Sequence, residues 1–387
     1  MRRILFVANG HGETAIAARI GAEIERAAAA GPVGLDLFPV VGLGAGAAPL
    51  AVVGPRQTMP SGGLVAMGNV RAFSRDVAAG FAALFVRQLA FLASVPAYDL
   101  VVAVGDAYAL GLALTTRRPV AFVGTAKSVH VAPYGPVERG LLRRAVRIFV
   151  RDEATAERLR SEGVPAEAPG NVIVDLIGAP GPAPAAGAWI GLLPGSREDA
   201  YADGVRLARV ARELGALRPG LGSLFSIAPT LDAARFVRVL EEDGWTVTPP
   251  DAAEDPPPIA FRARAGSAAL FGWRGDLAAL FGASVAVLGQ AGTANEQAAA
   301  SGLPVVALDR SEPGGAPGDG WYRMRQVGLL GDAVLLVPPE PAAAAAAIAD
   351  LLDHPERMRA MSDAGRARMG PPGGAAAIAS SLLELVA

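Results

Sequence analysis

Short runs rich in β-branched residues alternate with helical patterns along almost the whole chain, and this alternation limits the possible folds more than any other feature. It indicates parallel sheets whose strands are joined by crossover helices. The expected strands of the first half are Ile4–Ala8, Leu35–Val41, Leu100–Val104, Val120–Val123 and Arg147–Val150. The expected helices there are Thr14–Ala29, Phe73–Ser94, Ala107–Thr115, Val137–Ala145 and Glu153–Ser161.

A break and then a second alternating series follow. Residues 178–188, GAPGPAPAAGA, are too rich in Gly, Pro and Ala for the interior of an element and are expected to be a linker. The second series has expected strands at Trp189–Leu193, Ser223–Ile227, Ser284–Leu288, Pro304–Leu308 and Val334–Val337. Its expected helices are Asp199–Leu214, Leu231–Glu242, Thr293–Ser301, Pro341–Leu352 and Ala375–Val386, while residues 250–270 fit neither pattern.

The sequence therefore predicts two doubly wound, Rossmann-like α/β domains, at residues 1–177 and 189–370, with a cleft between them. Residues 371–387 are expected to form a C-terminal helix that packs back on the first domain. In such sheets ligands bind at the carboxyl ends of the strands, so function is expected in the loops that follow strands.

Composition excludes several classes of protein. With 387 residues, 52% of them hydrophobic, the chain can bury sizeable cores, and its net charge of -2 offers no basic field for nucleic acid. The absence of cysteine excludes disulfides and thiolate chemistry, and three histidines argue against a multi-histidine metal site. The most apolar stretch, Gly80–Val95, is too short to span a membrane and contains Arg87. We expect a cytoplasmic protein or one peripheral at the inner face of the membrane.

Two loops of the first domain carry titratable groups. NGHGET, residues 9–14, offers Gly10 and Gly12 for close backbone approach to a ligand, with His11 and Glu13 beside them. Thr14 is expected to cap the helix that follows, and a tight turn with a capped helix would explain this loop without any function. In VGDAYA, Asp106 follows a buried strand as either a general base or a helix cap.

Two loops of the second domain suit an anion. LLPGSRED places Gly195, Ser196 and Arg197 after a strand and before a helix, as a phosphate cradle would require. In LGQAGTANEQ the pair Gly292-Thr293 opens a helix, and a helix start aims N–H groups and the helix dipole at an anion. The first turn of this Ala-rich helix carries three adjacent polar side chains, Asn295, Glu296 and Gln297, which favour a binding role. Glu296 is placed to accept hydrogen bonds from ribose hydroxyls.

A third region has weaker signals. Lys127, the single lysine, and His130 are candidates to face an acceptor, although a solvated loop lysine is an equal explanation. Five arginines with no acid among them could bind anionic headgroups, or could simply form a solvated face: Arg139, Arg143, Arg144, Arg147 and Arg151.

These motifs carry a family resemblance over nearly the whole chain. PGSR, followed later by GTANEQ and SGLPVV, resembles lipid-A-disaccharide synthases and their relatives, which are inverting glycosyltransferases of the GT-B fold. VGDAYALGLAL, PSGGLVAMGNVRAF and APGNVIVD resemble other segments of that family. NGHGET differs from the synthase's opening loop, and VGTAKSVHVAPYG replaces its acceptor segment, so the pattern looks most like the lipid-A-disaccharide synthase-related subgroup.

The resemblance implies transfer of a sugar, of the N-acetylhexosamine type, from a UDP-sugar to a lipid or glycolipid-like acceptor. Asp106 is the expected base, with Glu13 and His11 as reserves, and the anion-binding loops of the second domain would hold the diphosphate. No D-x-D sequence is present, so neither a metal nor another cofactor is expected. A UDP-sugar 2-epimerase of the same fold and a non-catalytic nucleotide-sugar-binding protein remain as alternatives.

Overall fold

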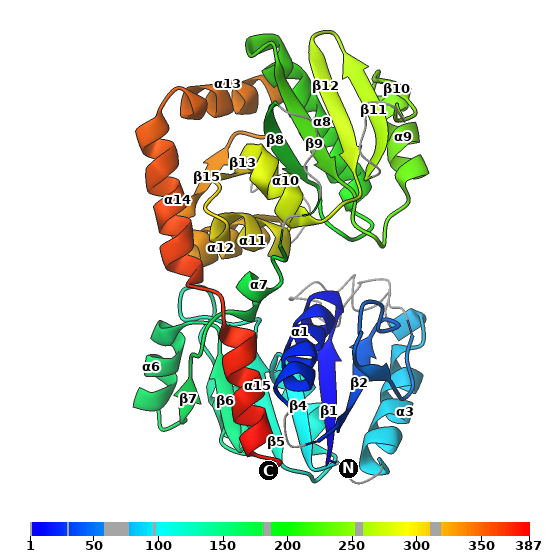
Figure 1. Ribbon diagram of the computed structural model, residues 1–387, viewed down its shortest axis with the longest axis vertical. Helices are drawn as coiled ribbons and strands as arrows, with labels where there is room; N and C mark the ends of the chain where they lie inside the picture. Colours follow the sequence, from blue (N-terminus) through cyan, green and yellow to red (C-terminus); the bar gives the residue numbers. More distant parts are fainter. Residues whose placement is uncertain are drawn as a thin grey trace. The chain divides into compact units, whose positions relative to one another are not determined.

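The structure is a computed structural model that describes residues 2–28, 31–57, 77–95, 98–179, 181, 187–251, 258–309 and 319–387. The chain divides into two compact units, an N-terminal unit of residues 1–176 and 370–387 and a C-terminal unit of residues 177–369. Each unit has its own α/β sheet, coloured along the sequence in Figure 1. The α/β class predicted from the alternation is therefore confirmed.

The sheet of the N-terminal unit has seven strands in the order β3-β2-β1-β4-β5-β6-β7, and all neighbours pair in parallel. Its strands are β1 Arg2–Asn9, β2 Val33–Val41, β3 Ala51–Val52, β4 Leu100–Gly105, β5 Val120–Gly124, β6 Arg147–Val150 and β7 Ala166–Glu167. The chain moves from β1 to β2 on one side and later to β4 on the other, so the strand order reverses between β1 and β4. Doubly wound sheets bind ligands at such a reversal.

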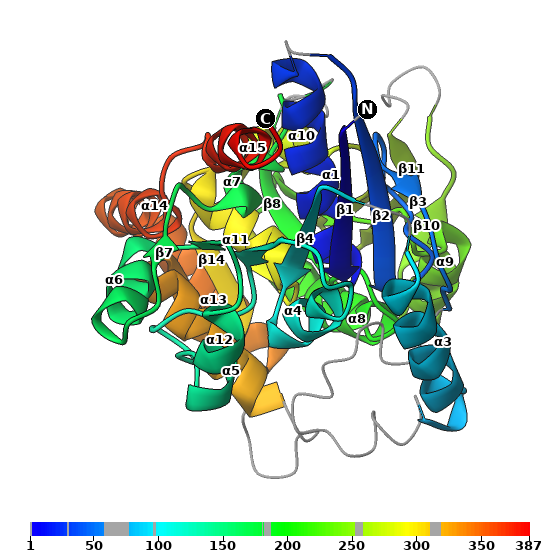
Figure 2. The same ribbon diagram turned by 90° about the horizontal axis from the view of Figure 1, so that it is seen from below.

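Helices cover both faces of this sheet, with α1 and α15 over one face and α3 and α4 over the other (Figure 2). The helices are α1 His11–Ala27, α3 Phe81–Ala93, α4 Ala107–Leu114, α5 Pro136–Leu142, α6 Glu153–Ser161, α7 Val172–Asp175 and α15 Gly374–Glu384. Because both faces are covered, residues 4–8 and 100–104 of the two central strands are fully buried and apolar throughout. Residues 73–76 of one predicted helix lie outside the described residues.

The C-terminal unit has an eight-stranded sheet in the order β10-β11-β12-β9-β8-β13-β14-β15. Its strands are β8 Ala188–Leu193, β9 Leu221–Ser226, β10 Thr246–Thr248, β11 Ile259–Ala265, β12 Ala268–Trp273, β13 Ser284–Gly289, β14 Val305–Leu308 and β15 Val334–Val337. The strand order reverses between β8 and β13. At one edge β10, β11 and β12 pair antiparallel, so part of the stretch 250–270 that matched no pattern forms strand.

The helices of the C-terminal unit are α8 Ala200–Leu217, α9 Ala233–Glu242, α10 Leu277–Ala283, α11 Thr293–Ala300, α12 Asp319–Leu330, α13 Pro341–Leu352 and α14 Pro355–Met369, with a short 3₁₀ turn, η1, at Gly331–Ala333. Three of these were not predicted: α10, α12 and α14. No helix in the described part of the chain is long and apolar enough to cross a membrane.

The last helix, α15, belongs to the N-terminal unit, although it follows the C-terminal unit in sequence. The carboxylate of Asp175 accepts hydrogen bonds from the backbone N–H groups of Gly373 at 2.6 Å and Ala375 at 2.7 Å. Gly170 and Gly374 also meet so closely that a Cβ on Gly374 would lie 2.6 Å from the carbonyl oxygen of Gly170. The segments that leave and re-enter this unit are therefore fastened to each other. Residues 180 and 182–186 of the predicted linker lie outside the described residues.

Candidate active site

The two predicted anion-binding loops of the C-terminal unit lie side by side. The carbonyl oxygen of Leu193, the last residue of β8, accepts hydrogen bonds from the backbone N–H groups of Gln290 at 2.9 Å and Ala291 at 3.1 Å. Because β8 and β13 are parallel neighbours, the loops that follow them start at the same edge of the sheet, where the strand order reverses. This is the position at which α/β sheets of this type bind ligands.

The loop after β8 presents a free cation. Gly195 has φ +115°, a backbone conformation that favours glycine, and the next two residues, Ser196 and Arg197, are exposed. No carboxylate among the described residues forms an ion pair with Arg197. An unpaired guanidinium beside the start of α8 suits a phosphate group.

The loop after β13 leads into a helix start without a side-chain cap. Gly292 is the N-cap of α11, and Gly292 and Thr293 are half-buried, so the first N–H groups of the helix are not used by a capping side chain. Uncapped N–H groups at a helix start are suitable donors for an anion.

The polar side chains of the first turn of α11 are more buried than their pattern suggests. Asn295, Glu296 and Gln297 are only 0%, 3% and 8% exposed. Asn295 donates from Nδ2 to the carbonyl oxygen of Gly289 at 3.4 Å and to Oε1 of Gln326 at 3.3 Å, which ties α11 to β13 and α12. Glu296 likewise has an interaction within the protein. Asn295 thus has an evident structural role, and ribose binding by Glu296 stays a prediction.

In the N-terminal unit, the loops after β1 and β4 meet through two side chains. Nδ2 of Asn9 donates to Oδ2 of Asp106 at 3.0 Å, and Oδ1 of Asp106 accepts from the backbone N–H groups of Tyr108 at 3.0 Å and Ala109 at 3.1 Å. Asp106 is therefore the N-cap of α4, and Asn9 also orients its second oxygen. Both residues lie where the strand order reverses, so the cap also stands at the expected ligand edge.

Glu13 brings a second carboxylate to this edge. A Cβ on Gly10 would lie 3.0 Å from Oε2 of Glu13, and a Cβ on Gly105 would lie 3.1 Å from its Cγ. Gly10 and Gly105 have φ of +108° and +127°, so both the backbone conformation and the contact with Glu13 favour glycine there. The carboxylates of Glu13 and Asp106 are thus both positioned by the strand ends of β1 and β4.

The start of α1 differs from the prediction. The helix begins at His11 with Gly10 as N-cap and no capping side chain, so the expected cap by Thr14 is wrong. Thr14 instead lies in the first turn with its side chain buried. Gly12 is also in that turn, and the side chain of His11 is outside the described part of the structure.

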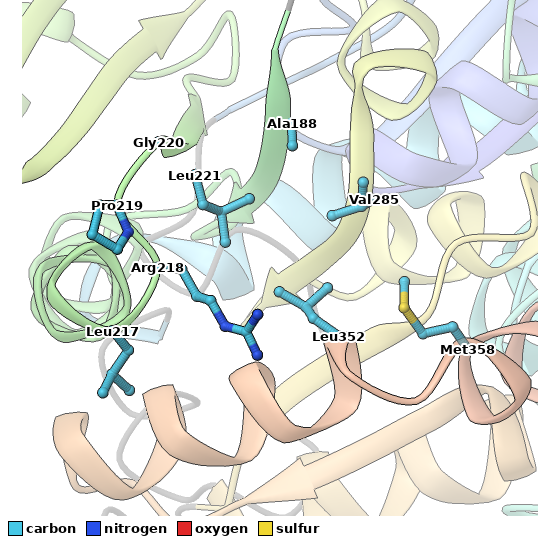
Figure 3. Close-up of a pocket in the computed structure, with 9 residues that line it drawn as sticks. All are labelled: Ala188, Leu217, Arg218, Pro219, Gly220, Leu221, Val285, Leu352 and Met358. Atoms are coloured by element: carbon cyan, nitrogen blue, oxygen red, sulfur yellow. The ribbon is translucent and has the colours of Figure 1, made fainter.

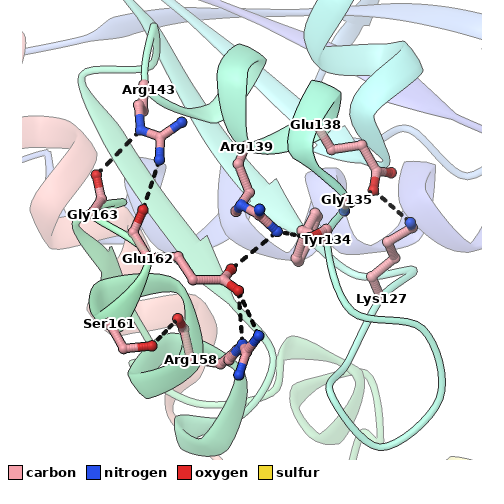
Figure 4. A network of polar contacts seen from close by, with 10 residues as sticks. All are labelled: Lys127, Tyr134, Gly135, Glu138, Arg139, Arg143, Arg158, Ser161, Glu162 and Gly163. Atoms are coloured by element: carbon pink, nitrogen blue, oxygen red, sulfur yellow. Dashed lines mark hydrogen bonds and ion pairs between the residues drawn. The ribbon is translucent and has the colours of Figure 1, made fainter.

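The acceptor-side candidates lie in the loop after β5, and one of them is held by the protein itself (Figure 4). Nζ of Lys127 is 2.6 Å from Oε2 of Glu138 and 5.8 Å from the centre of the Tyr134 ring. The same Glu138 oxygen accepts from the backbone N–H of Gly135 at 2.7 Å. Lys127 therefore fastens this loop to α5, while His130 is exposed.

The arginine group does not form a free basic patch (Figure 4). Arg139 pairs with Glu162 at 3.2 Å, and Arg143 donates to the carbonyl oxygen of Glu162 at 2.7 Å. Arg147 pairs with Glu167 at 2.7 Å, and Arg151 is only 8% exposed. Four of the five guanidinium groups are thus engaged within the N-terminal unit, which disfavours the anionic-lipid interpretation of this group.

Two phenols near these loops remain protonated over a wide pH range. Burial, and secondly the nearby charge of Asp106, raises the pKa of Tyr108 to about 12. Burial, and secondly the charge of Glu138, raises the pKa of Tyr134 well above its ordinary value. Neither hydroxyl has a hydrogen-bond partner among the described residues.

An open groove lies elsewhere in the described C-terminal unit. It has a volume of about 550 Å³ and is lined by Ala188, Leu217, Arg218, Pro219, Gly220, Leu221, Val285, Leu352 and Met358 (Figure 3). Ala188, Leu221 and Val285 are at the amino ends of β8, β9 and β13, so this groove is at the edge of the sheet opposite the anion-binding loops. In the described residues no group of three or more potential carboxylate or histidine ligands is placed to hold a metal ion.

Asn9 and Gln326 were not among the sequence-predicted site residues. The only local signal for Asn9 is that a polar residue ends the apolar run Ile4–Ala8. In the structure Asn9 is only 7% exposed. Gln326 is fully buried in α12 and gives no such signal, because its partner Asn295 lies 31 residues away in sequence.

Neither a protein-family model nor a curated protein sequence matches the chain. Among solved structures, S. aureus MnaA, solved with UDP, is similar with a TM-score of 0.60 and 14% identity over 100% of this chain and 98% of that one. The UDP-GlcNAc 2-epimerase from Neisseria meningitidis, bound to UDP-GlcNAc, is similar with a TM-score of 0.53 and 14% identity over 99% of each chain. The calicheamicin glycosyltransferase CalG4 is similar with a TM-score of 0.56 and 16% identity over 100% of this chain and 98% of that one. At these identities the likeness concerns the fold, and the chain has the GT-B fold of these UDP-sugar epimerases and glycosyltransferases.

Proposed function

We propose that this protein is an enzyme that acts on a UDP-sugar and holds the UDP part with its C-terminal unit. The observation that carries the proposal is the pair of hydrogen bonds to the carbonyl oxygen of Leu193, which brings the loop with Arg197 beside the start of α11. Together these loops offer a guanidinium, the Ser196 hydroxyl and uncapped helix N–H groups, which are suitable partners for a diphosphate. The likeness to proteins solved with UDP or UDP-GlcNAc supports a uridine nucleotide over another anion.

The first candidate reaction is epimerisation at C2 of a UDP-N-acetylhexosamine. Inverting C2 requires that one group removes its proton and that a proton returns on the opposite face. Two carboxylates, Glu13 and Asp106, are available at one edge of the N-terminal sheet. The likeness to 2-epimerases over almost the full length of both chains also supports this reaction.

The second candidate is transfer of the sugar to a lipid acceptor, as in lipid-A-disaccharide synthase-related proteins. Asp106 would then take the acceptor proton, with Glu13 and His11 as reserves, and the loops with Gly10, Gly12 and His130 would lie on the acceptor side. The sequence resemblance and the likeness to CalG4 support transfer. An exposed apolar face of α3 also suits peripheral contact with a lipid surface, since Val86 is 64% exposed and its exposed neighbours include Ala82, Ala83 and Ala90.

One experiment separates these reactions. The protein is incubated with UDP-GlcNAc in D₂O without an acceptor, and the products are followed by NMR. Epimerisation would give UDP-ManNAc with deuterium at C2, whereas a transferase would leave C2 protonated and release UDP only when a cell lipid extract is added. Binding of UDP without any turnover would identify a non-catalytic nucleotide-sugar-binding protein, and absence of UDP binding would overturn the whole proposal.

A further inference from the structure

We propose that Arg235 is a positioning residue for the diphosphate, because it holds the carboxylate of Glu198 and so leaves the neighbouring Arg197 free for the ligand. The inference rests on the proposed function, since it assumes that Arg197 binds the diphosphate of a UDP-sugar. In this proposal Arg235, which belongs to α9, acts on nucleotide binding through the Glu198 carboxylate and makes no contact with the nucleotide itself.

The geometry of the loop supplies the first argument. Glu198 directly follows Arg197 in an exposed loop, where a carboxylate is a competing partner for an adjacent guanidinium. Oε1 of Glu198 instead lies 2.5 Å from Nη2 of Arg235, while Arg197 makes no ion pair with a described residue. The acid next to the candidate phosphate ligand is therefore already neutralised.

Arg235 is well placed to hold this carboxylate. Its guanidinium carbon lies 3.9 Å from the centre of the Tyr201 ring, a distance at which a cation is attracted to the ring face. Tyr201 is only 7% exposed, and its hydroxyl accepts from the backbone N–H of Asp232 at 2.9 Å. An isolated ion pair at the surface contributes little, but this one is oriented by a stacked and buried ring.

A second contact braces the same loop against the segment before α9. The hydroxyl of Thr230 donates to the carbonyl oxygen of Ser196 at 3.0 Å. The loop is therefore tied at Ser196 and at Glu198, on either side of Arg197, whose side chain stays exposed and makes no ion pair with a described residue.

The charge balance gives the third argument. The ionised side chains of this loop and of the helix start that contacts it are Arg197, Glu198, Asp199, Asp232 and Arg235, two cations and three anions with a net charge of -1. Loss of Arg235 makes this net charge -2 beside a site for an anionic diphosphate. Such a change lowers affinity through unfavourable electrostatics that salt screens.

The test measures UDP binding by calorimetry at low ionic strength. Arg197→Ala is expected to weaken binding, and Arg235→Met, which keeps the aliphatic stem over Tyr201, is expected to weaken it about three- to tenfold. Adding Glu198→Gln to Arg235→Met should restore most of the affinity, because the competing carboxylate is then gone. Raising the salt concentration to about 0.5 M should reduce the difference between wild type and Arg235→Met.

Arg209→Met is the matched control, since Arg209 also extends from a helix of this unit and pairs with an acid, Asp243, at 2.6 Å. It should bind UDP like the wild type. Wild-type affinity in Arg235→Met or Arg197→Ala, or a double variant as weak as Arg235→Met, would overturn the inference. Failure of the wild type itself to bind UDP would overturn the proposed function, so the two failures are distinguishable.

Discussion

Nδ2 of Asn9 donates to Oδ2 of Asp106 at 3.0 Å, which joins the last residue of β1 to the residue that follows β4. The other oxygen of Asp106 caps α4 through two backbone N–H groups. A single carboxylate thus starts a helix and is also held at the edge of the sheet where the strand order reverses. A structural and a catalytic role predict different behaviour for the same substitution.

Asp106→Asn is expected to separate these two roles. Asparagine caps helices about as well as aspartate, and the amide of Asn9 can turn to present its Oδ1, which no described residue contacts by a hydrogen bond, to the new side chain. Stability should therefore change little, whereas loss of a general base should lower kcat roughly 10²–10⁴-fold with UDP affinity unchanged. Kinetics, calorimetry and thermal unfolding of the variant check this.

The control is Asp152→Asn, because Asp152 also follows a strand of this sheet and caps a helix, α6, by accepting from Thr155. It should leave kcat unchanged. If Asp106→Asn keeps its turnover and melts at a lower temperature, Asp106 is a cap alone and the base is to be sought at Glu13 or His11.

The positions of the loops could be predicted because parallel strands buried on both faces are continuously apolar, as residues 100–104 are. Each such run ends where polar or glycine residues begin, which identified the loops at 9–14, 104–109 and 192–199. The edge hairpin was missed because β11 alternates Ala and Arg, and Arg262 reaches over the Phe271 ring at 5.8 Å. Such a strand has no continuous apolar run.

Contacts between distant residues account for most of what the sequence could not predict. Helix α14 packs through backbone, since a Cβ on Gly365 would lie 2.5 Å from the carbonyl oxygen of Ala299, and such packing leaves little apolar periodicity. Asn9 meets Asp106 across 97 residues, and no local pattern reports that pairing. The salt bridge of Lys127 to Glu138 likewise became visible only in the folded loop.

Glu296→Ala is expected to weaken UDP binding about tenfold or more, because charge-assisted hydrogen bonds to ribose hydroxyls contribute roughly 1.5–3 kcal/mol. Glu296 is only 3% exposed, so the alanine variant also leaves a small void and should melt at a lower temperature. Glu296→Gln keeps the volume and should show an intermediate affinity. Calorimetry on both variants, with thermal unfolding alongside, measures this, and unchanged affinity in both would contradict the ribose assignment.

Activity is expected to be independent of added divalent metal, because fixed groups of the anion-binding loops, the Arg197 guanidinium and the start of α11, are suited to stabilise a diphosphate without a bridging ion. Turnover of UDP-GlcNAc is measured before and after treatment with EDTA and gel filtration. The rate should persist. Complete loss of turnover, restored only by added Mg²⁺ or Mn²⁺, would contradict this expectation and reveal a metal site.

Tyr134→Phe is expected to leave stability at pH 7 unchanged or to raise it. The hydroxyl of Tyr134 is buried and has no hydrogen-bond partner in the part of the chain that the structure describes, and an unsatisfied buried group costs about 1–3 kcal/mol. Tyr98→Phe is the control, because Tyr98 donates to Asp36 at 2.8 Å and its loss should lower the free energy of unfolding by about 0.5–3 kcal/mol. Urea unfolding of both variants gives the comparison, and a Tyr134→Phe variant clearly less stable than wild type at pH 7 would contradict the first expectation.

The same phenols predict a loss of stability in alkali. Burial first, and then the Asp36 hydrogen bond for Tyr98 and the Asp106 charge for Tyr108, raises the pKa of each phenol to about 12. The unfolded chain releases these protons near the ordinary pKa of about 10. Between pH 10 and 12 the unfolded state therefore binds fewer protons than the folded state, and the free energy of unfolding falls as the pH rises. Because burial also raises the pKa of Tyr134, the Tyr134→Phe variant removes one contributor and should lose stability less steeply between pH 10 and 12. Urea unfolding at a series of pH values measures both slopes, and equal slopes would show that Tyr134 ionises alike in the folded and unfolded chain.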